Sequence, residues 1–378
     1  FKLNIIYILV FILSRFSYYF KRVKESPLDK TINIFFLKFK KVFFVFVYQK
    51  QIYNFFFKPK IKKKYFKEFT LYKNQVQQRF DALNIKKTNQ EIIENLDDGY
   101  FQCLGYGNVD LENFNWNTDP FHDYKWESCY FNKIDFACLS DRCDVKVPWE
   151  ISRLQFLLNL AVEYNQRKND THLIQFNRLL NDWNEKNPVG YGVSWICTME
   201  VSIRIVNIII SLMFLYDYLD LKQRAKIYKI ILEHYIFIKR FPEISDVPGN
   251  HYLSNLMGAY ICSFVINGKK HKETRKHFSE FLIEANNQFD VDGCHFEKAT
   301  IYHRLCLEFV ALVISFESKL DHDEGLELYE IYLNGIRFCE LISSNHKLPI
   351  FGDSDSGHVI WLGNDCRDFE YLKQPFHI

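Results

Sequence analysis

Asn250 and Tyr302 carry side chains that could bind an anion and move a proton. Asn250 follows Pro248-Gly249, where we expect a helix to begin, so its neutral amide and the positive helix end would both favour a carboxylate. Tyr302 carries a phenol, which can give its proton to a departing oxygen and take one back. The structural alternatives are that Asn250 only caps its helix and that Tyr302 only packs in an aromatic-rich protein.

A histidine follows each of these two residues in the sequence. The imidazoles of His251 and His303 would titrate near neutral pH, so either ring could orient a substrate or share a proton transfer. Neighbouring residues of a helix point about 100° apart, so His251 and Asn250 need not face the same side. Either histidine could equally be a satisfied residue of a helix surface.

Three charged residues could bind a polar or acidic substrate. Arg204 could hold an acidic group, or it could pair with Glu200 one helical turn earlier. Arg304 is a second local cation. Glu297 could bind hydroxyl groups or orient a catalytic partner, and its alternative is an acid in the first turn of a helix that begins near residue 298.

Trp195 and Tyr191 are suited to stacking on the ring faces of a substrate, although an aromatic after glycine often covers the core instead. Asp353 and Asp355 could ligate a divalent ion, yet carboxylates in a loop of glycine and serine more often form turns. We therefore predict no metal site and no cofactor.

The ten cysteines contain no Cys-x-x-Cys pair, which disfavours a zinc ribbon, a redox motif and an iron–sulfur cluster. Four of them lie in apolar helical patterns and are expected to be buried reduced thiols: Cys197, Cys262, Cys306 and Cys339. A disulfide is a possibility only within the close trio Cys129, Cys138 and Cys143, and only if the protein is exported.

Helices must position these residues, because apolar residues recur at helical spacing through most of the chain. The predicted helices cover residues 148–166, 171–184, 195–218, 221–239, 250–267, 271–288, 298–318 and 325–344. Residues 100–147 read as an irregular connector. Successive antiparallel helix pairs can form a bundle, a solenoid or a toroid, and no fixed-period repeat supports the solenoid. In a toroid, alternate loops would emerge on one side, which would bring together residues 187–195, 246–251 and 290–302.

Composition and charge limit the classes of protein that fit. Hydrophobic residues (48%) can fill a sizeable core, and the low counts of glycine (14) and proline (9) argue against a turn-rich all-β fold. Residues 1–70 hold 16 basic and 3 acidic side chains, whereas the remainder of the chain holds 32 basic and 43 acidic ones.

The basic stretch 58–67 could contact nucleic acid or a membrane surface, but a solvated face is favoured and no nucleic-acid partner is predicted. The apolar run 5–13 is shorter than the roughly 18 residues of a membrane span and lacks a cleavage site, so neither a span nor a signal peptide is predicted.

Several motifs occur in the order and approximate spacing of the heparinase II/III-like polysaccharide lyases. They are VPWEISRL (147–154), NPVGYGVSW (187–195), TMEVSIRIVN (198–207), GNHYLSNL (249–256), DGCHFEKATIYHRL (292–305) and FGDSDSG (351–357). The chain resembles that family over residues 95–365. The resemblance implies an (α/α) toroid followed by an antiparallel β-sandwich, and cleavage of uronic-acid polysaccharides of the heparin/heparan or alginate kind by β-elimination.

The resemblance also implies roles for the residues above. Tyr302 matches the family's catalytic tyrosine, acting as acid and possibly also as base, and Asn250 would neutralise the uronate carboxylate. His251 and His303 would assist at the catalytic site, and Glu297 matches an acidic position of the motif. The expected substrate-binding residues are Glu297, Arg204, Trp195, Tyr191 and Arg304. An exported or cell-envelope setting is implied as well, although the compartment stays unknown.

We expect three segments: a basic helical extension (1–95), a toroid (96–365) and a connection (366–378) toward a β-sandwich for which the chain has no room. In the family, a histidine of that sandwich supplies the base, so this chain by itself is expected to have weak or no lyase activity. The alternatives are a non-catalytic toroid that binds acidic polysaccharide, and an α/α-toroid glycoside hydrolase that uses Glu297 and Asp292.

Overall fold

The computed structural model describes residues 89–103, 105–137, 142–317, 323–355 and 357–373, and every structural statement below concerns these residues. The chain divides into two compact units, Phe1–Lys58 and Pro59–Ile378. All described residues belong to the second unit. The predicted helical extension over 1–95 therefore lies almost entirely outside the described residues.

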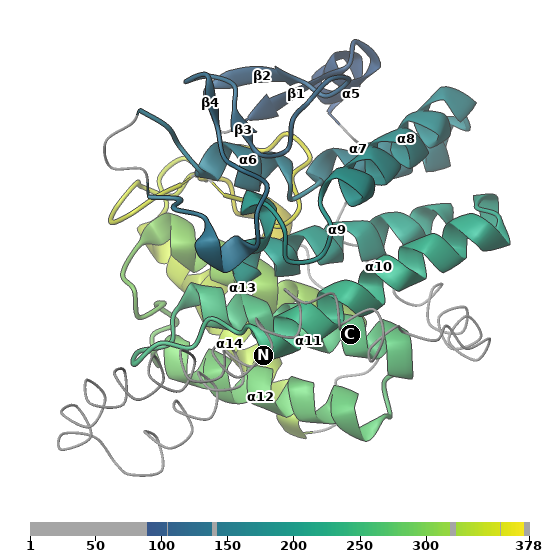
Figure 1. The fold of residues 1–378 in the computed structure, drawn as a ribbon. Helices are drawn as coiled ribbons and strands as arrows, with labels where there is room; N and C mark the ends of the chain where they lie inside the picture. Colours follow the sequence, from purple (N-terminus) through teal and green to yellow (C-terminus); the bar gives the residue numbers. More distant parts are fainter. Residues whose placement is uncertain (1–88, 104, 138–141, 318–322, 356, 374–378) are drawn as a thin grey trace, which may run out of the picture. The chain divides into compact units, whose positions relative to one another are not determined.

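Eight long helices of the described part form four consecutive pairs of contacting helices (Figure 1). The pairs are α7 (Gln155–Arg167) with α8 (Asp170–Lys186), α9 (Thr198–Leu215) with α10 (Leu221–Arg240), α11 (Asn250–Asn267) with α12 (Lys272–Gln288), and α13 (Thr300–Phe316) with α14 (Asp323–Ile342). The first helices of the pairs also contact one another in the order α7, α9, α11, α13. They form an inner row, and the second helices lie outside it. This is the predicted incomplete (α/α) toroid of antiparallel helix pairs.

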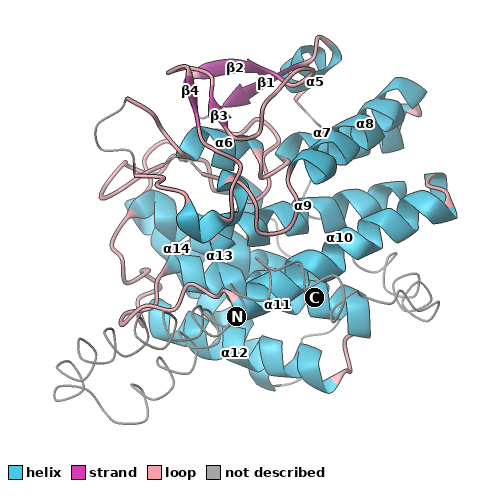
Figure 2. Cartoon of the chain, viewed as in Figure 1, coloured by secondary structure: helices cyan, strands magenta, loops and turns pink. Residues whose placement is uncertain are grey.

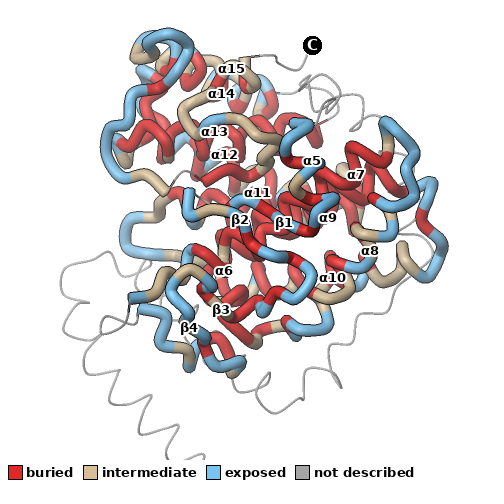
Figure 3. The backbone as a smooth tube through the Cα atoms, turned by 90° about the horizontal axis from the view of Figure 1, so that it is seen from above, coloured by how far each residue is buried: buried red, intermediate tan, exposed pale blue. Residues whose placement is uncertain are grey.

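The inner helices are mostly buried because each lies between an outer partner and its inner neighbours. Every residue of α9 is buried, and the tube in Figure 3 is coloured as buried along most of the inner row. Together with the turn that follows it, α9 is apolar and long enough to cross a membrane, yet all of Thr198–Leu215 is buried within the described structure. The outer helix α12 instead buries one face, which includes Thr274, Phe278 and Phe281.

The predicted irregular connector contains two short antiparallel hairpins that the sequence did not reveal (Figure 2). After α5 (Gln90–Asp97), β1 (Tyr100–Cys103) pairs with β2 (Gly107–Asp110), and β3 (Thr118–Asp119) pairs with β4 (Tyr124–Lys125). In the first hairpin, Phe101 opposes Val109 and both are buried. Strands of two to four residues carry too little alternation to be recognised from sequence.

The first predicted helix is broken into α6 (Lys146–Ile151) and α7 by a left-handed residue, Leu154 (φ 57°). The break holds the buried Arg153 between two carboxylates, with Nη1 2.5 Å from Glu150 and Nε 2.6 Å from Glu200. It also leaves the carbonyl oxygen of Ser152 as an acceptor for Arg204 (3.2 Å). The helical pattern of residues 148–166 did not indicate this interruption, because the side chains that bind at the break, Glu200 and Arg204, come from a helix distant in sequence.

The segment after α14 crosses back over the inner helices and ends in α15 (Glu370–Lys373). Gln155 of α7 donates to the carbonyl of His358 at 2.7 Å, and Asn207 of α9 donates to that of Val359 at 2.8 Å. The backbone N–H of Val359 in turn donates to Glu308 of α13 at 2.7 Å. This segment therefore joins the first and last inner helices.

Candidate active site

The loops that precede α9, α11 and α13 meet at one end of the inner row, as the toroid prediction requires. The backbone N–H of Met199, at the start of α9, donates to Glu243 of the loop before α11 at 2.7 Å. The backbone N–H of Asn250, at the start of α11, donates to Glu297 of the loop before α13 at 2.8 Å. Three helix N-termini therefore lie near one another, and their dipoles favour an anion at this end.

Asn250 is the first residue of α11, and Gly249 rather than Asn250 is the N-cap. The Asn250 side chain binds Glu297 instead of capping the helix, because Nδ2 donates to Oε2 at 2.8 Å. A side chain at position 249 would collide with the same carboxylate, since a Cβ there would lie 2.7 Å from Oε1 of Glu297. Gln288 adds a further restraint by donating to the carbonyl of Gly249 at 3.0 Å.

Tyr302 is the one residue of α13 that is not buried. Its hydroxyl donates to Oδ2 of Asp353 at 3.0 Å. Partial burial, followed by the negative charges of Asp355, Asp353 and Glu297, raises the pKa of Tyr302 well above its usual value. The phenol, which is protonated at neutral pH even at the ordinary pKa of a tyrosine, thus keeps its proton.

His251 has a side chain that is 46% exposed, and its Nδ1 lies 3.2 Å from Oε1 of Glu243. Burial of part of the ring opposes protonation, but the hydrogen bond and the charge of Glu243 outweigh it and raise the pKa of His251. The same contact lowers the pKa of Glu243 against the effect of its burial. Cys197 lies beside the pair, with Sγ 3.6 Å from Nδ1 of His251.

His303 follows Tyr302 but faces the interior. It is 1% exposed, accepts the backbone N–H of His295 on Nδ1 (3.2 Å) and lies with Nε2 3.1 Å from the carbonyl of Gly335 in α14. Burial lowers the pKa of His303 to about 4. Both ring nitrogens are thus engaged in the core, and the structure does not bring them to Asn250.

Arg204 and Trp195 also lie in the core. Arg204 is fully buried, and its guanidinium carbon lies 4.4 Å from the ring centre of Trp183 and 5.1 Å from that of Trp195. Burial lowers the pKa of Arg204 to about 9. Its expected partner Glu200 instead binds Arg153 through both carboxylate oxygens, at 2.6 and 2.9 Å.

Arg304 is fully buried and binds Glu308 (2.8 Å), the ring of His358 (3.0 Å) and the hydroxyl of Tyr371 (3.0 Å). Its contacts thereby fix the returning segment to α13. Tyr191 is half-buried and packs edge-on against Tyr130, with ring centres 5.7 Å apart.

Sequence reasoning did not single out Glu243, the partner of both His251 and Met199. It lies in a loop eight residues before His251 and belongs to no motif, so only its acidic character could have drawn notice. The sequence suggested Asp353 as a possible metal ligand, whereas in the structure its carboxylate accepts a hydrogen bond from the hydroxyl of Tyr302. The described cysteines are free, and Cys138 of the possible disulfide trio lies outside the described residues.

These features define an (α/α) toroid with a polar site at the N-termini of its inner helices. The chain belongs to the Heparinase II/III N-terminus family, whose model matches residues 49–368. No curated protein matches the chain.

Solved structures of polysaccharide lyases share this fold. Heparan sulfate lyase HepC from Pedobacter heparinus matches with a TM-score of 0.53 at 18% identity, over 76% of this chain and 45% of HepC. A structure described as Heparinase III matches with a TM-score of 0.51 at 13% identity, over 80% of this chain and 51% of that protein. The chain thus spans about half the length of these relatives, and at such identities the likeness shows the fold.

Proposed function

We propose that this chain supplies the helical part of the active site of a lyase that cleaves uronic-acid polysaccharide, heparin/heparan-like or alginate-like, by β-elimination. One observation carries the proposal. Asn250 and Tyr302 lie at the N-termini of adjacent inner helices, and the carboxylate of Glu297 both holds Asn250 and acts electrostatically on Tyr302. Family membership and the lyase fold of HepC support the same assignment.

Asn250 is proposed to bind the uronate carboxylate. Elimination requires that this charge be neutralised, so that the proton on C5 becomes acidic. The bond to Glu297 uses one of the two hydrogens on Nδ2 and fixes the amide plane. The second hydrogen can donate to the substrate, and the N-terminus of α11 adds to the attraction. Glu297 is then a positioning residue.

Tyr302 is proposed to protonate the departing glycosidic oxygen, because its phenol carries a proton at neutral pH and is the one side chain of α13 that is not buried. His251 is the best-placed base among the described residues. Glu243 accepts the hydrogen on Nδ1, which leaves Nε2 free to take the C5 proton. His303, Arg204, Trp195 and Arg304 have no proposed contact with substrate, because all four are at most 1% exposed, against 6% for Asn250, and are bonded within the core.

The test is the rate at which the chain forms unsaturated, ultraviolet-absorbing product from heparan sulfate, hyaluronate, chondroitin or alginate. We expect Asn250→Ala and Tyr302→Phe each to reduce turnover by about 100-fold or more. Tyr302→Phe should leave substrate binding intact, whereas Asn250→Ala should weaken it. Matched controls are Asn267→Ala, at the far end of α11, and Tyr329→Phe, half-buried on α14.

Other outcomes would contradict the proposal. Cleavage without an unsaturated product would indicate a hydrolase, although both oxygens of Glu297 accept from Asn250 and are poorly placed for acid catalysis. Salt-sensitive binding without any cleavage, unchanged in both Asn250→Ala and Tyr302→Phe, would indicate a non-catalytic binding toroid.

A further inference from the structure

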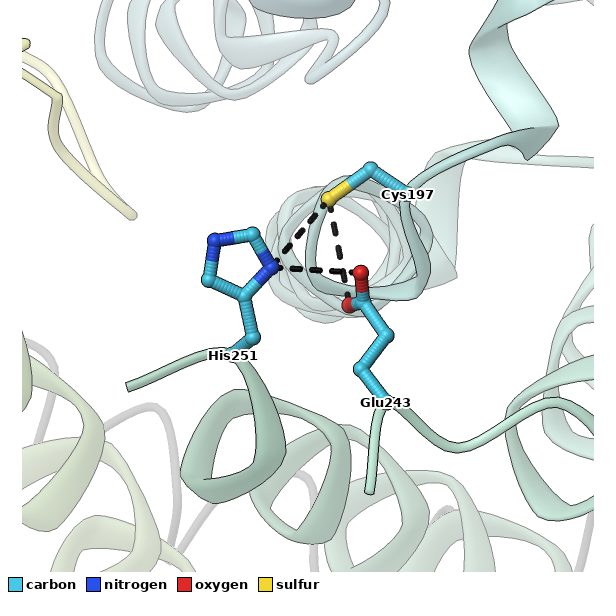
Figure 4. Close-up of side chains that lie close together, drawn as sticks. All are labelled: Cys197, Glu243 and His251. Atoms are coloured by element: carbon cyan, nitrogen blue, oxygen red, sulfur yellow. Dashed lines mark hydrogen bonds and ion pairs between the residues drawn. The ribbon is translucent and has the colours of Figure 1, made fainter. Parts of the chain in front are cut away.

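Three different metal-ligand side chains converge beside the candidate active site (Figure 4). Cys197 is the N-cap of α9, Glu243 lies in the loop after α10, and His251 is the second residue of α11. Sγ of Cys197 is 3.6 Å from Nδ1 of His251 and 3.8 Å from Oε2 of Glu243. Nδ1 is 3.2 Å from Oε1 of Glu243.

These separations match the edges of a tetrahedral metal site. Zinc binds cysteine sulfur at about 2.3 Å and histidine nitrogen or carboxylate oxygen at about 2.0–2.2 Å. Tetrahedral angles then place sulfur about 3.6 Å from nitrogen and from oxygen, and nitrogen about 3.4 Å from oxygen. Each observed distance agrees with its expected edge to about 0.2 Å, but sulfur faces Oε2 of Glu243 whereas nitrogen faces Oε1, so the carboxylate has to turn to offer one oxygen to both edges. The side chains are therefore spaced for an ion without a change of backbone.

The surroundings hold two of the ligands in place and leave the third open to solvent. The Glu243 carboxylate accepts the backbone N–H of Met199 at 2.7 Å, and the backbone N–H of Glu243 donates to Asn255 at 2.7 Å. Such outer contacts orient metal ligands. Cys197 is buried at 3% exposure, whereas the half-exposed ring of His251 provides a path of entry and room for a fourth ligand.

We propose that Cys197, Glu243 and His251 bind one zinc-class divalent cation, with water as the fourth ligand. Sulfur and imidazole ligands favour Zn²⁺ over Ca²⁺ and Mg²⁺, which prefer oxygen. Binding converts the Cys197 thiol to a thiolate and releases its proton to solvent. The site goes beyond the proposed lyase function and shares His251 with it. A cation on Nδ1 takes the place of the hydrogen that Glu243 accepts and leaves a hydrogen on Nε2, so metal binding and the base role of His251 exclude one another. Metal binding itself requires no substrate.

Titration of the full chain with Co²⁺ tests the site directly, because a thiolate bound to Co²⁺ gives a sulfur-to-metal charge-transfer absorbance. We expect one equivalent of Co²⁺ to bind with this absorbance and to be displaced by Zn²⁺. Cys197→Ser should abolish the absorbance, and His251→Ala should weaken Zn²⁺ binding by at least about 10-fold. Zn²⁺ should also raise the unfolding temperature of the unsubstituted chain but not of Cys197→Ser.

The matched control variants remove a histidine and a cysteine that lie outside the cluster. His346→Ala removes an exposed histidine that lies 3.1 Å from Glu370, and Cys366→Ser removes a half-buried thiol. Both should keep the full signal. The proposal is overturned if the unsubstituted chain binds no Co²⁺ at micromolar concentration, or if Cys197→Ser retains the charge-transfer absorbance. If Cys197→Ser does not fold, the variant His251→Ala, at a half-exposed position, provides the test. A Zn²⁺ affinity of His251→Ala equal to that of the unsubstituted chain would then overturn the proposal.

Discussion

The orientation of the Asn250 side chain depends on Gly249 as well as on the carboxylate of Glu297. Glu297 accepts from both the backbone and the side chain of Asn250, and it can approach the backbone only because residue 249 has no Cβ. Gly249 has a φ of −118°, which other residues also adopt, so the requirement is for space and not for an unusual backbone. The residue before the catalytic candidate thus has a defined function.

Substitution of Gly249 by alanine should therefore lower activity more than stability. The added Cβ would displace the Glu297 carboxylate and release the Asn250 amide, so we expect turnover to fall by about 10-fold or more. Steady-state kinetics and urea unfolding of Gly249→Ala would check this. Glu297→Gln should reduce turnover in the same way. Full activity in Gly249→Ala would show that the contact does not position Asn250.

The break between helices α6 and α7 contains a buried network of charged side chains. Arg153 is 3% exposed and lies between the carboxylates of Glu150 and Glu200, so the network ties the short helix α6 to α9. Burial raises the pKa of Glu150 to about 7 even though Arg153 opposes the shift. Arg153 thus binds both carboxylates with one guanidinium.

Arg153→Met should be strongly destabilising, because it leaves two buried carboxylates without their cation. We expect a loss of about 3–5 kcal/mol in the free energy of unfolding, measured by urea denaturation. Arg178→Met serves as the control, since the Arg178–Glu112 pair is exposed and 4.0 Å long, and it should change stability by less than about 1 kcal/mol. Equal effects of the two substitutions would contradict the proposed network.

Across the whole described domain, buried histidines link stability to pH. Burial lowers the pKa of four of them, to about 4 for His303 and about 3 for His295, and below the usual value for His234 and His358. In the unfolded chain these rings would titrate near 6.5. Between these values the unfolded state binds more protons, so each such ring makes stability fall as pH falls.

His303→Gln should reduce this pH dependence. Between pH 6.5 and pH 4.5, the unsubstituted chain should lose about 2–3 kcal/mol more unfolding free energy than the variant does, because one unfavourable protonation has been removed. Urea unfolding at the two pH values measures the difference. The exposed residue His346 provides the control His346→Gln, which should behave like the unsubstituted chain. An identical decline in His303→Gln would refute the assignment.

The sequence by itself determined the helices, the order of the motifs and the class of fold. All eight predicted helices occur, although the first is broken into α6 and α7. Their ends mostly agree to within two or three residues, because apolar periodicity and turn residues are local properties. The continuous apolar composition of α9 and α13 likewise reflects their place in the inner row.

Only the tertiary structure decided which side chains share the site. Tyr302 and His303 are neighbours in sequence, yet the helix turns one toward Asp353 and the other toward Gly335. Arg204 and Trp195 fitted a substrate site by residue type but lie in the core. Glu243 joins Cys197 and His251 from a separate loop. Such convergence depends on how helices pack across long sequence separations, which local periodicity does not encode.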